Sequence, residues 1–141
     1  MRVGVFIVGA PKAGTTSLHY HLNEHPDIVM SSRKETDYFS ADEILDQKLY
    51  YNRPPILSLE DYLNLFPSLE RHKLYGESSV SYLFYPSVPD KIYQYNPSSK
   101  IIIMLRDPLD RAFSHYLMDQ RMGLNSKKFD EIFHEGSGLF F

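Results

Sequence analysis

The sequence predicts an α/β domain built in layers around a mostly parallel sheet. An apolar run over residues 3–8 has the composition of a strand that is covered on both faces, and a second apolar run, over residues 100–105, also predicts a strand. Each run passes through a short turn into a segment whose apolar residues have helical spacing. Strand-like and helix-like segments also alternate along the chain, which is typical of parallel sheets. Ligands of such sheets bind at the carboxyl ends of the strands.

Four strands and four helices follow from this pattern. The strands are expected over residues 3–8, 28–30, 74–76 and 100–105. The helices are expected from Thr15 or Thr16 to about Glu24, from Ser58 past Phe66, over 87–95, and from Asp107 to Gly123. The polar segment 31–40 is expected to be a loop.

Boundary residues support these limits. Thr15 or Thr16, Ser58 and Asp107 are residue types that cap helices at the amino end, and Pro108 suits a first helical turn. Gly123 is expected to be the carboxyl-terminal cap of the last helix.

Composition limits the chemistry. The 141 residues are sufficient for one domain and contain no cysteine, which excludes disulfides and thiol-based metal or nucleophilic chemistry. The formal net charge of -3 gives no broad attraction to nucleic acid or anionic membranes. An anion site must therefore be built locally. No apolar run is long enough to span a membrane, and residues 3–8 do not lead into a cleavage region. A cytoplasmic location is expected, although a fragment could have lost a Golgi-type anchor.

The segment between the first strand and the first helix has the features of an anion-binding loop. Gly14 allows close approach of the backbone, and the amides from Ala13 to Thr16 can point at one anion. The helix amino terminus adds partial positive charge, and Lys12 adds a full one. The alternative is an ordinary strand-to-helix turn with a surface lysine.

The position of the lysine distinguishes this loop from that of nucleotide triphosphatases. In those enzymes the motif G-x-x-x-x-G-K-[ST] places lysine after the second glycine. Gly9 and Gly14 keep the glycine spacing, but Thr15 stands in the lysine position and Lys12 precedes Gly14. The run from Pro11 to Thr16 resembles P-K-[AGS]-G-T-[TS], the 5′-phosphosulfate loop of sulfotransferases that use 3′-phosphoadenosine 5′-phosphosulfate (PAPS).

This resemblance implies a P-loop NTPase-like fold of three layers and the use of PAPS as co-substrate. Lys12 would contact the bridging oxygen and the departing 5′-phosphate as the electrophilic catalyst. The residues expected to bind that phosphate are Lys12, Ala13, Gly14, Thr15, Thr16 and Ser17. A sulfuryl group carries less negative charge than a phosphoryl group, so lysine and amide donors can act without a metal.

A second segment, over residues 101–116, resembles the 3′-phosphate motif of the same family. It is an apolar strand that ends in R-[DN]-P and continues into R-[AL]-x-S-x-[YW]. The resemblance implies that Arg106 and Ser114 hold the 3′-phosphate of the donor. Taken alone, Arg106 would be a solvated cap residue or an ion-pair partner. Arg111 is expected to be structural or to lie on the helix surface.

The candidate base is Glu35. The segment from Lys34 to Phe39 resembles K-E-x-x-[FY]-F of glycan-modifying sulfotransferases, in which the glutamate is the catalytic base. An attacking hydroxyl or amine must lose a proton, which a carboxylate in a cleft can accept. This chain has Thr36 and Asp37 where members of the family often carry proline and histidine. A histidine base and a solvated charged loop are the alternatives.

Several other residues were candidates for smaller roles. Glu77 is expected to shape the site or to pair with a lysine. Three aromatic residues are expected to line an acceptor cleft, namely Tyr82, Phe84 and Tyr85. Three histidines near the first helix are interpreted as surface residues and no metal site is predicted; they are His19, His21 and His25.

The sequence-based hypothesis is sulfuryl transfer from PAPS to a hydroxyl or amine, with a small-molecule or carbohydrate acceptor. The resemblance covers Val3 to about Gly123, and Gly136-Ser137-Gly138 does not match the late glycine- and lysine-containing segment of the family. Residues 1–141 are therefore expected to be a partial domain, either a fragment or a truncated member with impaired donor binding. A P-loop nucleotide kinase and an inactive nucleotide-binding remnant are the alternatives.

Overall fold

The computed structural model describes residues 2–47, 53–67 and 73–135. Its sheet has four strands in the order β2-β3-β1-β4, and every pair of neighbours is parallel. The strands are β1 (Val5–Gly9), β2 (Ile28–Met30), β3 (Leu74–Ser78) and β4 (Lys100–Ile103). The predicted parallel sheet and its four strands are confirmed.

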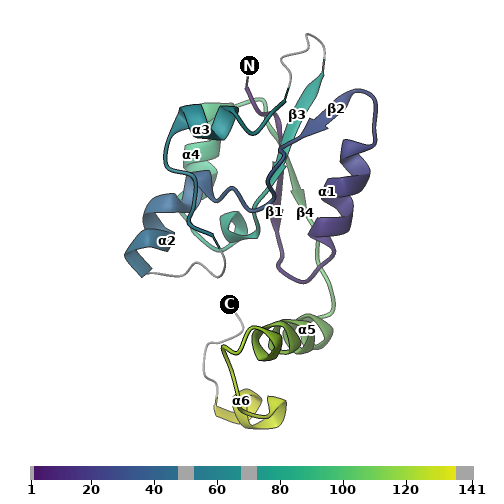
Figure 1. Cartoon of the computed structure of the whole chain (residues 1–141), viewed down its shortest axis with the longest axis vertical. Helices are drawn as coiled ribbons and strands as arrows, with labels where there is room; N and C mark the ends of the chain where they lie inside the picture. The colour runs from purple at the N-terminus through teal and green to yellow at the C-terminus, as the bar shows by residue number, and fades with distance from the viewer. Residues whose placement is uncertain (1, 48–52, 68–72, 136–141) are drawn as a thin grey trace.

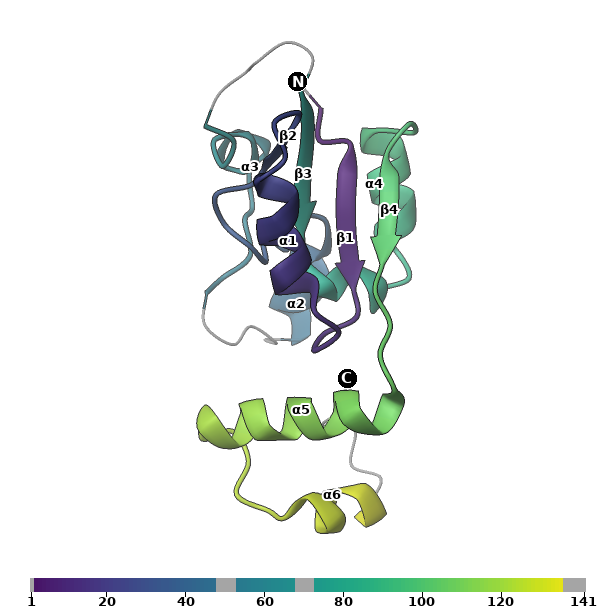
Figure 2. The ribbon, with the colours of Figure 1, turned by 90° about the vertical axis from the view of Figure 1, so that its right-hand side faces the viewer.

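Helices lie on both faces of the sheet, so the predicted layered architecture is confirmed as well. Helix α1 covers one face, and α2, α3 and α4 lie on the other (Figure 1). Helix α5 runs across the end of the molecule to which the strand arrows point, with α6 beyond it (Figure 2). The helices are α1 (Thr15–Asn23), α2 (Ala41–Gln47), α3 (Leu59–Leu63), α4 (Val88–Tyr95), α5 (Pro108–Arg121) and α6 (Phe129–Glu135).

Four short elements are absent from the sequence-based assignment. The single 3₁₀ turns η1 (Tyr38–Ser40) and η2 (Val80–Leu83) and the seven-residue helices α2 and α6 are too short for a clear periodic signal. Residues 38–40 therefore correct the expectation that all of 31–40 is loop. None of the described helices has the length and apolar character needed to cross a membrane.

Burial differs between the two strands that the sequence made most prominent. All five residues of β1 are buried, as predicted, because β1 has a neighbouring strand on each side. Strand β4 is an edge strand, and Ile101 and Ile103 are 48% and 52% exposed. The strand predicted over residues 100–105 is therefore present, and it lies at the edge of the sheet.

Aromatic side chains form much of the core on the face that carries α3 and α4. The ring of Phe39 makes edge contacts with the rings of Phe6, Tyr62, Tyr82 and Tyr95. Phe39 is in η1, directly after the loop that carries the candidate base. The packing of this ring therefore fixes one end of that loop.

The helix ends confirm most of the predicted caps and correct one. The Ser58 hydroxyl accepts a hydrogen bond from the Asp61 amide, and Asp107 caps α5 with Pro108 as its first residue. Gly123, at φ 70°, follows α5 in a left-handed conformation that suits glycine. The cap of α1 is Gly14, whereas Thr15 begins the helix and makes no side-chain cap.

His19 corrects another expectation, because it is buried rather than on the surface. It lies on the side of α1 that packs toward β2 and the following loop. Burial, with a smaller contribution from Lys34, lowers the pKa of His19. His21 is exposed and pairs with Glu24, as a surface residue does.

Candidate functional site

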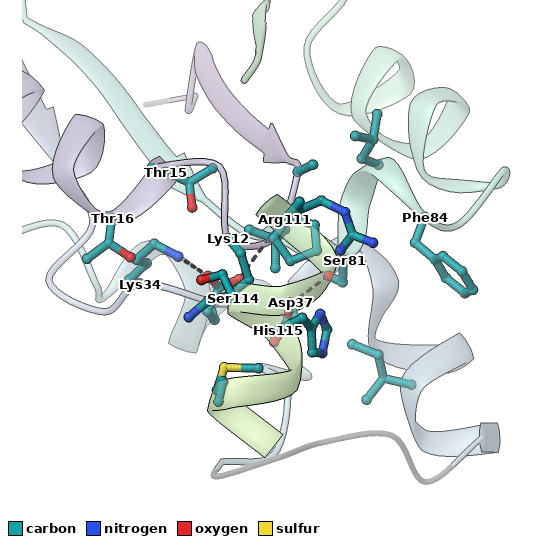
Figure 3. Close-up of a pocket in the computed structure, with 18 of the residues that line it drawn as sticks. Lys12, Thr15, Thr16, Lys34, Asp37, Ser81, Phe84, Arg111, Ser114 and His115 are labelled. Atoms are coloured by element: carbon teal, nitrogen blue, oxygen red, sulfur yellow. Dashed lines mark hydrogen bonds and ion pairs between the residues drawn. The ribbon is translucent and has the colours of Figure 1, made fainter. Parts of the chain in front are cut away.

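A large cleft lies between the carboxyl ends of the strands and α5. Its volume is about 1180 Å³. It is lined by the turn after β1, the loop before η1, η2, and one face of α5 (Figure 3). This is the position at which parallel α/β sheets bind ligands, as the sequence analysis expected.

The turn after β1 brings its anion-binding groups to this cleft. Gly14 adopts φ 94°, a left-handed conformation that starts α1 without a side-chain cap. Lys12, Gly14, Thr15 and Thr16 all line the cleft. Ala13 and Ser17 belong to the same turn and helix but are not among the lining residues.

Strand β4 and the segment after it hold this turn from the side. The Ala10 amide donates to the Met104 carbonyl at 2.7 Å, and the Met104 amide donates to the Gly9 carbonyl at 2.8 Å. Arg106 Nη1 donates to the Lys12 carbonyl at 3.3 Å. The two phosphate-motif segments are therefore in direct contact, although they are far apart in the sequence.

The structure separates the two residues expected to hold the 3′-phosphate. Ser114, on α5, lines the cleft, whereas Arg106 is not among the lining residues. The Arg106 guanidinium is partly exposed and lies 4.0 Å from the Asp110 carboxylate. Arg106 thus contacts the backbone of the phosphate turn from outside the cleft.

One face of α5 contributes more to the cleft than the sequence analysis expected. Arg111, Ser114, His115, Met118 and Met122 line it, at spacings that place them on one side of a helix. Arg111 was expected to be structural or to lie on the helix surface, and its place among the lining residues of the cleft was not foreseen. The signal available in the sequence was its spacing of three residues from Ser114.

The loop with the candidate base forms the opposite wall. Glu35 adopts φ 56°, and its amide donates to the Ser78 carbonyl at 2.8 Å. Its carboxylate Oε2 accepts from the Val80 amide at 2.8 Å, and Oε1 pairs with Lys34 Nζ. Both Lys34 and Glu35 line the cleft. The predicted base therefore faces the same space as Lys12 and Ser114.

A second carboxylate on this loop was not singled out as a candidate. Asp37 lines the cleft, adopts φ 54°, and accepts a hydrogen bond from the Ser81 hydroxyl at 2.6 Å. Burial raises the pKa of Asp37, and the bond from Ser81 opposes this shift. The sequence signal that could have identified Asp37 was its spacing of two residues from Glu35.

Glu77 was expected to shape the site or to pair with a lysine, and the structure gives it hydroxyl partners. It is completely buried, and its carboxylate accepts hydrogen bonds from the hydroxyls of Thr36 at 3.0 Å and Ser79 at 2.8 Å. Burial raises the pKa of Glu77 to about 7. Tyr82 is part of this buried cluster rather than of the cleft wall, whereas Phe84 and Tyr85 line the cleft as predicted.

The charge of the cleft is opposite in sign to that of the whole chain. Five cationic side chains and two carboxylates are among its described lining residues: Lys12, Arg33, Lys34, Arg53, Arg111, Glu35 and Asp37. The chain has a formal charge of -3. The cleft is therefore a locally built site for an anion.

Comparison with known proteins assigns the family. The family model described as "Sulfotransferase domain" matches residues 3–140. The chain belongs to the sulfotransferase domain family. A solved sulfotransferase from Alicyclobacillus acidocaldarius superposes with a TM-score of 0.79 at 37% identity, covering 93% of this chain and 55% of that one. The predicted family and its P-loop-like α/β fold are confirmed.

Curated sulfotransferases are more distant relatives. Human heparan sulfate glucosamine 3-O-sulfotransferase 5 is 34% identical over 110 residues, which cover 78% of this chain and 29% of the relative. Mouse carbohydrate sulfotransferase 15 is 28% identical over 170 residues, covering 96% of this chain and 30% of the relative. The chain thus spans about a third of the length of these curated relatives.

Proposed function

We propose that this chain binds PAPS in the cleft and transfers its sulfuryl group to a hydroxyl or amine of a carbohydrate. The observation that carries the proposal is the convergence of Lys12, Ser114 and Glu35 on one cleft from three separate segments. Such convergence gives an electrophile, a phosphate ligand and a base in the arrangement that sulfuryl transfer needs.

The residues on the β1 and α5 sides fit the phosphate groups of the donor. The amino terminus of α1, the hydroxyls of Thr15 and Thr16, and the Lys12 ammonium are all anion-binding groups on the cleft wall. Ser114 and Arg111 add a hydroxyl and a guanidinium from α5. PAPS supplies the activated sulfuryl group, and Lys12 stabilises the charge that develops on the departing phosphate oxygen.

The proposed role of Glu35 is to accept the proton of the acceptor. As the acceptor oxygen or nitrogen forms its bond to sulfur, the bond from sulfur to the 5′-phosphate oxygen breaks and the acceptor proton moves to Glu35. The Val80 amide and Lys34 hold the carboxylate, whose side chain is 35% exposed. The carboxylate is thus both fixed and accessible from the cleft.

The carbohydrate acceptor is supported by two observations. The Lys34-Glu35 pair is the part of the sequence that resembles glycan-modifying members, and two relatives are named for heparan sulfate and carbohydrate substrates. Phe84 and Tyr85 add aromatic surface to the cleft, against which the apolar face of a sugar ring can pack.

Calorimetric titration tests the proposal against its rivals. The chain is titrated with 3′-phosphoadenosine 5′-phosphate (PAP), with the analogue that lacks the 3′-phosphate, and with ATP plus magnesium. PAP is expected to bind most tightly, because the 3′-phosphate meets Ser114 and the cationic wall. Equal or tighter binding of ATP with magnesium would contradict the proposal and favour a nucleotide kinase. PAP binding without turnover on any carbohydrate acceptor would favour an inactive remnant.

A further inference from the structure

Beneath the loop that carries Glu35 lies a buried cluster of hydroxyl groups around one carboxylate. Glu77, at 0% exposure, is near the end of β3 and is bonded by side chains from three segments, namely the loop, η2 with its cap, and α3. Its Oε2 accepts from Thr36 Oγ1 at 3.0 Å and from Ser79 Oγ at 2.8 Å, and Tyr82 also hydrogen-bonds to it. The Tyr62 hydroxyl approaches Oε1 at 3.4 Å.

This cluster extends directly into the backbone of the loop. Ser79 Oγ, while donating to Glu77, accepts from the Thr36 amide at 3.0 Å and the Asp37 amide at 3.1 Å. The Tyr82 hydroxyl accepts from the Phe39 amide at 3.3 Å. Three paths therefore join Glu77 to the residues that follow Glu35. Each path runs from the carboxylate to a hydroxyl and from that hydroxyl to a backbone amide, of Thr36, Asp37 or Phe39.

The loop needs such support, because two of its residues have an unfavourable backbone conformation. Glu35 and Asp37 have φ 56° and 54°, which are left-handed values for residues that carry a Cβ. Such a conformation is unfavourable for a residue with a Cβ and persists where its surroundings hold it. Thr36, between them, is 0% exposed and makes side-chain bonds into the cluster. The cluster thus holds the loop at its middle residue.

The geometry also excludes a direct chemical role for Glu77. Its side chain is completely buried and is not among the residues that line the cleft. A proton acceptor must come within hydrogen-bonding distance of the acceptor group. Glu77 can therefore act on the cleft only through the residues that it holds.

We propose that Glu77 is the positioning residue for Glu35, which it holds toward the cleft through Thr36 and Ser79. The proposal rests on the proposed function, in which Glu35 is the base. Ser79 is followed directly by Val80, whose amide donates to the Glu35 carboxylate. Fixing Ser79 thus fixes the Glu35 carboxylate as well as the loop backbone.

Amide hydrogen exchange tests the proposal without depending on turnover. In Glu77→Ala, the amides of Thr36, Asp37 and Val80 are expected to exchange about tenfold faster, because Ser79 loses the carboxylate that holds its hydroxyl and the bonds that depend on Ser79 open more often. The amides of Ala10 and Leu18, in the phosphate turn and α1, are the internal reference and should change little. Glu77→Gln keeps one acceptor oxygen and should restore most of the protection.

Two further variants keep the test decisive if Glu77→Ala does not fold. Ser79→Ala removes the acceptor of the Thr36 and Asp37 amides while the Thr36 and Tyr82 hydroxyls still bond Glu77, and should give the same exchange pattern. Ser87→Ala is the matched control, because Ser87 also bonds a glutamate, Glu43, at a site outside the loop. Unchanged loop exchange in Ser79→Ala, or equal acceleration in the reference amides, would overturn the proposal.

Kinetic measurements separate this proposal from the function on which it rests. In Glu77→Ala or Ser79→Ala, kcat is expected to fall by about 10²-fold, as for a misplaced catalytic group, while PAP affinity changes less than about twofold. Normal turnover in these variants, with turnover lost in Glu35→Gln, would contradict the positioning role alone. Normal turnover in Glu35→Gln would contradict the proposed base itself.

Discussion

The two walls of the cleft are built in different ways. The phosphate turn after β1 is made from neighbouring residues, with Gly14 in a left-handed conformation, the first turn of α1, and Lys12 two positions earlier. The loop with Glu35 is held by bonds to Ser78, Ser79 and Val80, which are more than 40 positions away in the sequence. The phosphate turn is also held by bonds to Met104 and Arg106, but its anion-binding groups come from one run of residues, whereas the placement of Glu35 depends on tertiary contacts.

This difference has a consequence for substitutions. A change in the phosphate turn alters a ligand-binding group directly and leaves the rest of the fold in place. A change in the cluster around Glu77 alters a buried polar network, in which every unsatisfied group is costly. Substitutions in the phosphate turn should therefore change ligand binding, whereas substitutions in the cluster around Glu77 should change stability.

The largest expected effect is on the rate of sulfuryl transfer and comes from a substitution in the phosphate turn. Lys12→Ala should lower the rate of sulfuryl transfer by about 10³-fold, since it removes the cation that stabilises the departing phosphate oxygen. Unfolding should remain close to wild type, because Lys12 is only half-buried. The measurement is single-turnover transfer from PAPS. Lys100→Ala, on the exposed start of β4, is the control and should transfer normally. A rate in Lys12→Ala within tenfold of wild type would remove Lys12 from the mechanism.

The next largest effect is on the pH dependence of stability, and it comes from Glu77, beneath the loop that carries Glu35. The pKa of Glu77 is raised by burial from 4.5 to about 7, so the folded chain binds more protons than the unfolded chain in this range. The stabilisation from this group is therefore complete below pH 4.5 and is lost as the pH rises through 7. The loss is on the order of 3 kcal/mol.

Glu77→Gln removes this titration. The variant should gain stability relative to wild type as the pH rises from 4.5 to 8, by roughly 3 kcal/mol in urea unfolding. Glu43→Gln is the control. Burial alone would raise the pKa of Glu43, but the bonds from Ser87 and Lys91 together outweigh it and leave this pKa lowered, so no gain is expected. A constant stability difference between Glu77→Gln and wild type across this pH range would show that Glu77 does not titrate there.

The sequence predicted the phosphate turn better than it predicted the support of the loop that carries Glu35. Lys12, Gly14 and the helix start could be placed from one run of residues, because each group acts through its own neighbours. Glu35 was also found by its motif, but its support was not. Thr36 looked like a departure from the family pattern, and its role became clear only when folding placed its hydroxyl beside Glu77.

The fold shows the same division. The strands and the longer helices were predicted from apolar patterns and caps, which are local signals. The exposure of β4, the burial of His19 and the position of Arg111 at the cleft depend on which elements become neighbours. No local pattern contains that information, so the surface assignment of His19 was wrong and the other two positions were not predicted.

A smaller effect is expected at the start of α1. Gly14→Ala places a Cβ on a residue at φ 94°, where it would lie 3.4 Å from Met104 Cε. The left-handed conformation should cost about 1 to 2 kcal/mol of stability and weaken PAP binding by about tenfold. Calorimetry gives the affinity, and amide exchange at Thr36 and Asp37 should stay as in wild type. Faster exchange in that loop would indicate that the two walls are not independent.

The smallest effect on stability and PAP affinity is expected at the cap of α5, the helix that brings Ser114 and Arg111 to the cleft. The Asp107 carboxylate accepts from the amides of Leu109 at 3.0 Å and Asp110 at 3.2 Å. Asp107→Ala should cost about 1 kcal/mol of stability, whereas Asp107→Asn keeps a capping oxygen and should cost a few tenths. Because the cap acts only on its own helix, PAP affinity should fall by about threefold or less, with loop exchange unchanged. A loss of PAP affinity as large as that in Gly14→Ala would mean that the α5 cap determines the geometry of the phosphate wall as strongly as the turn itself.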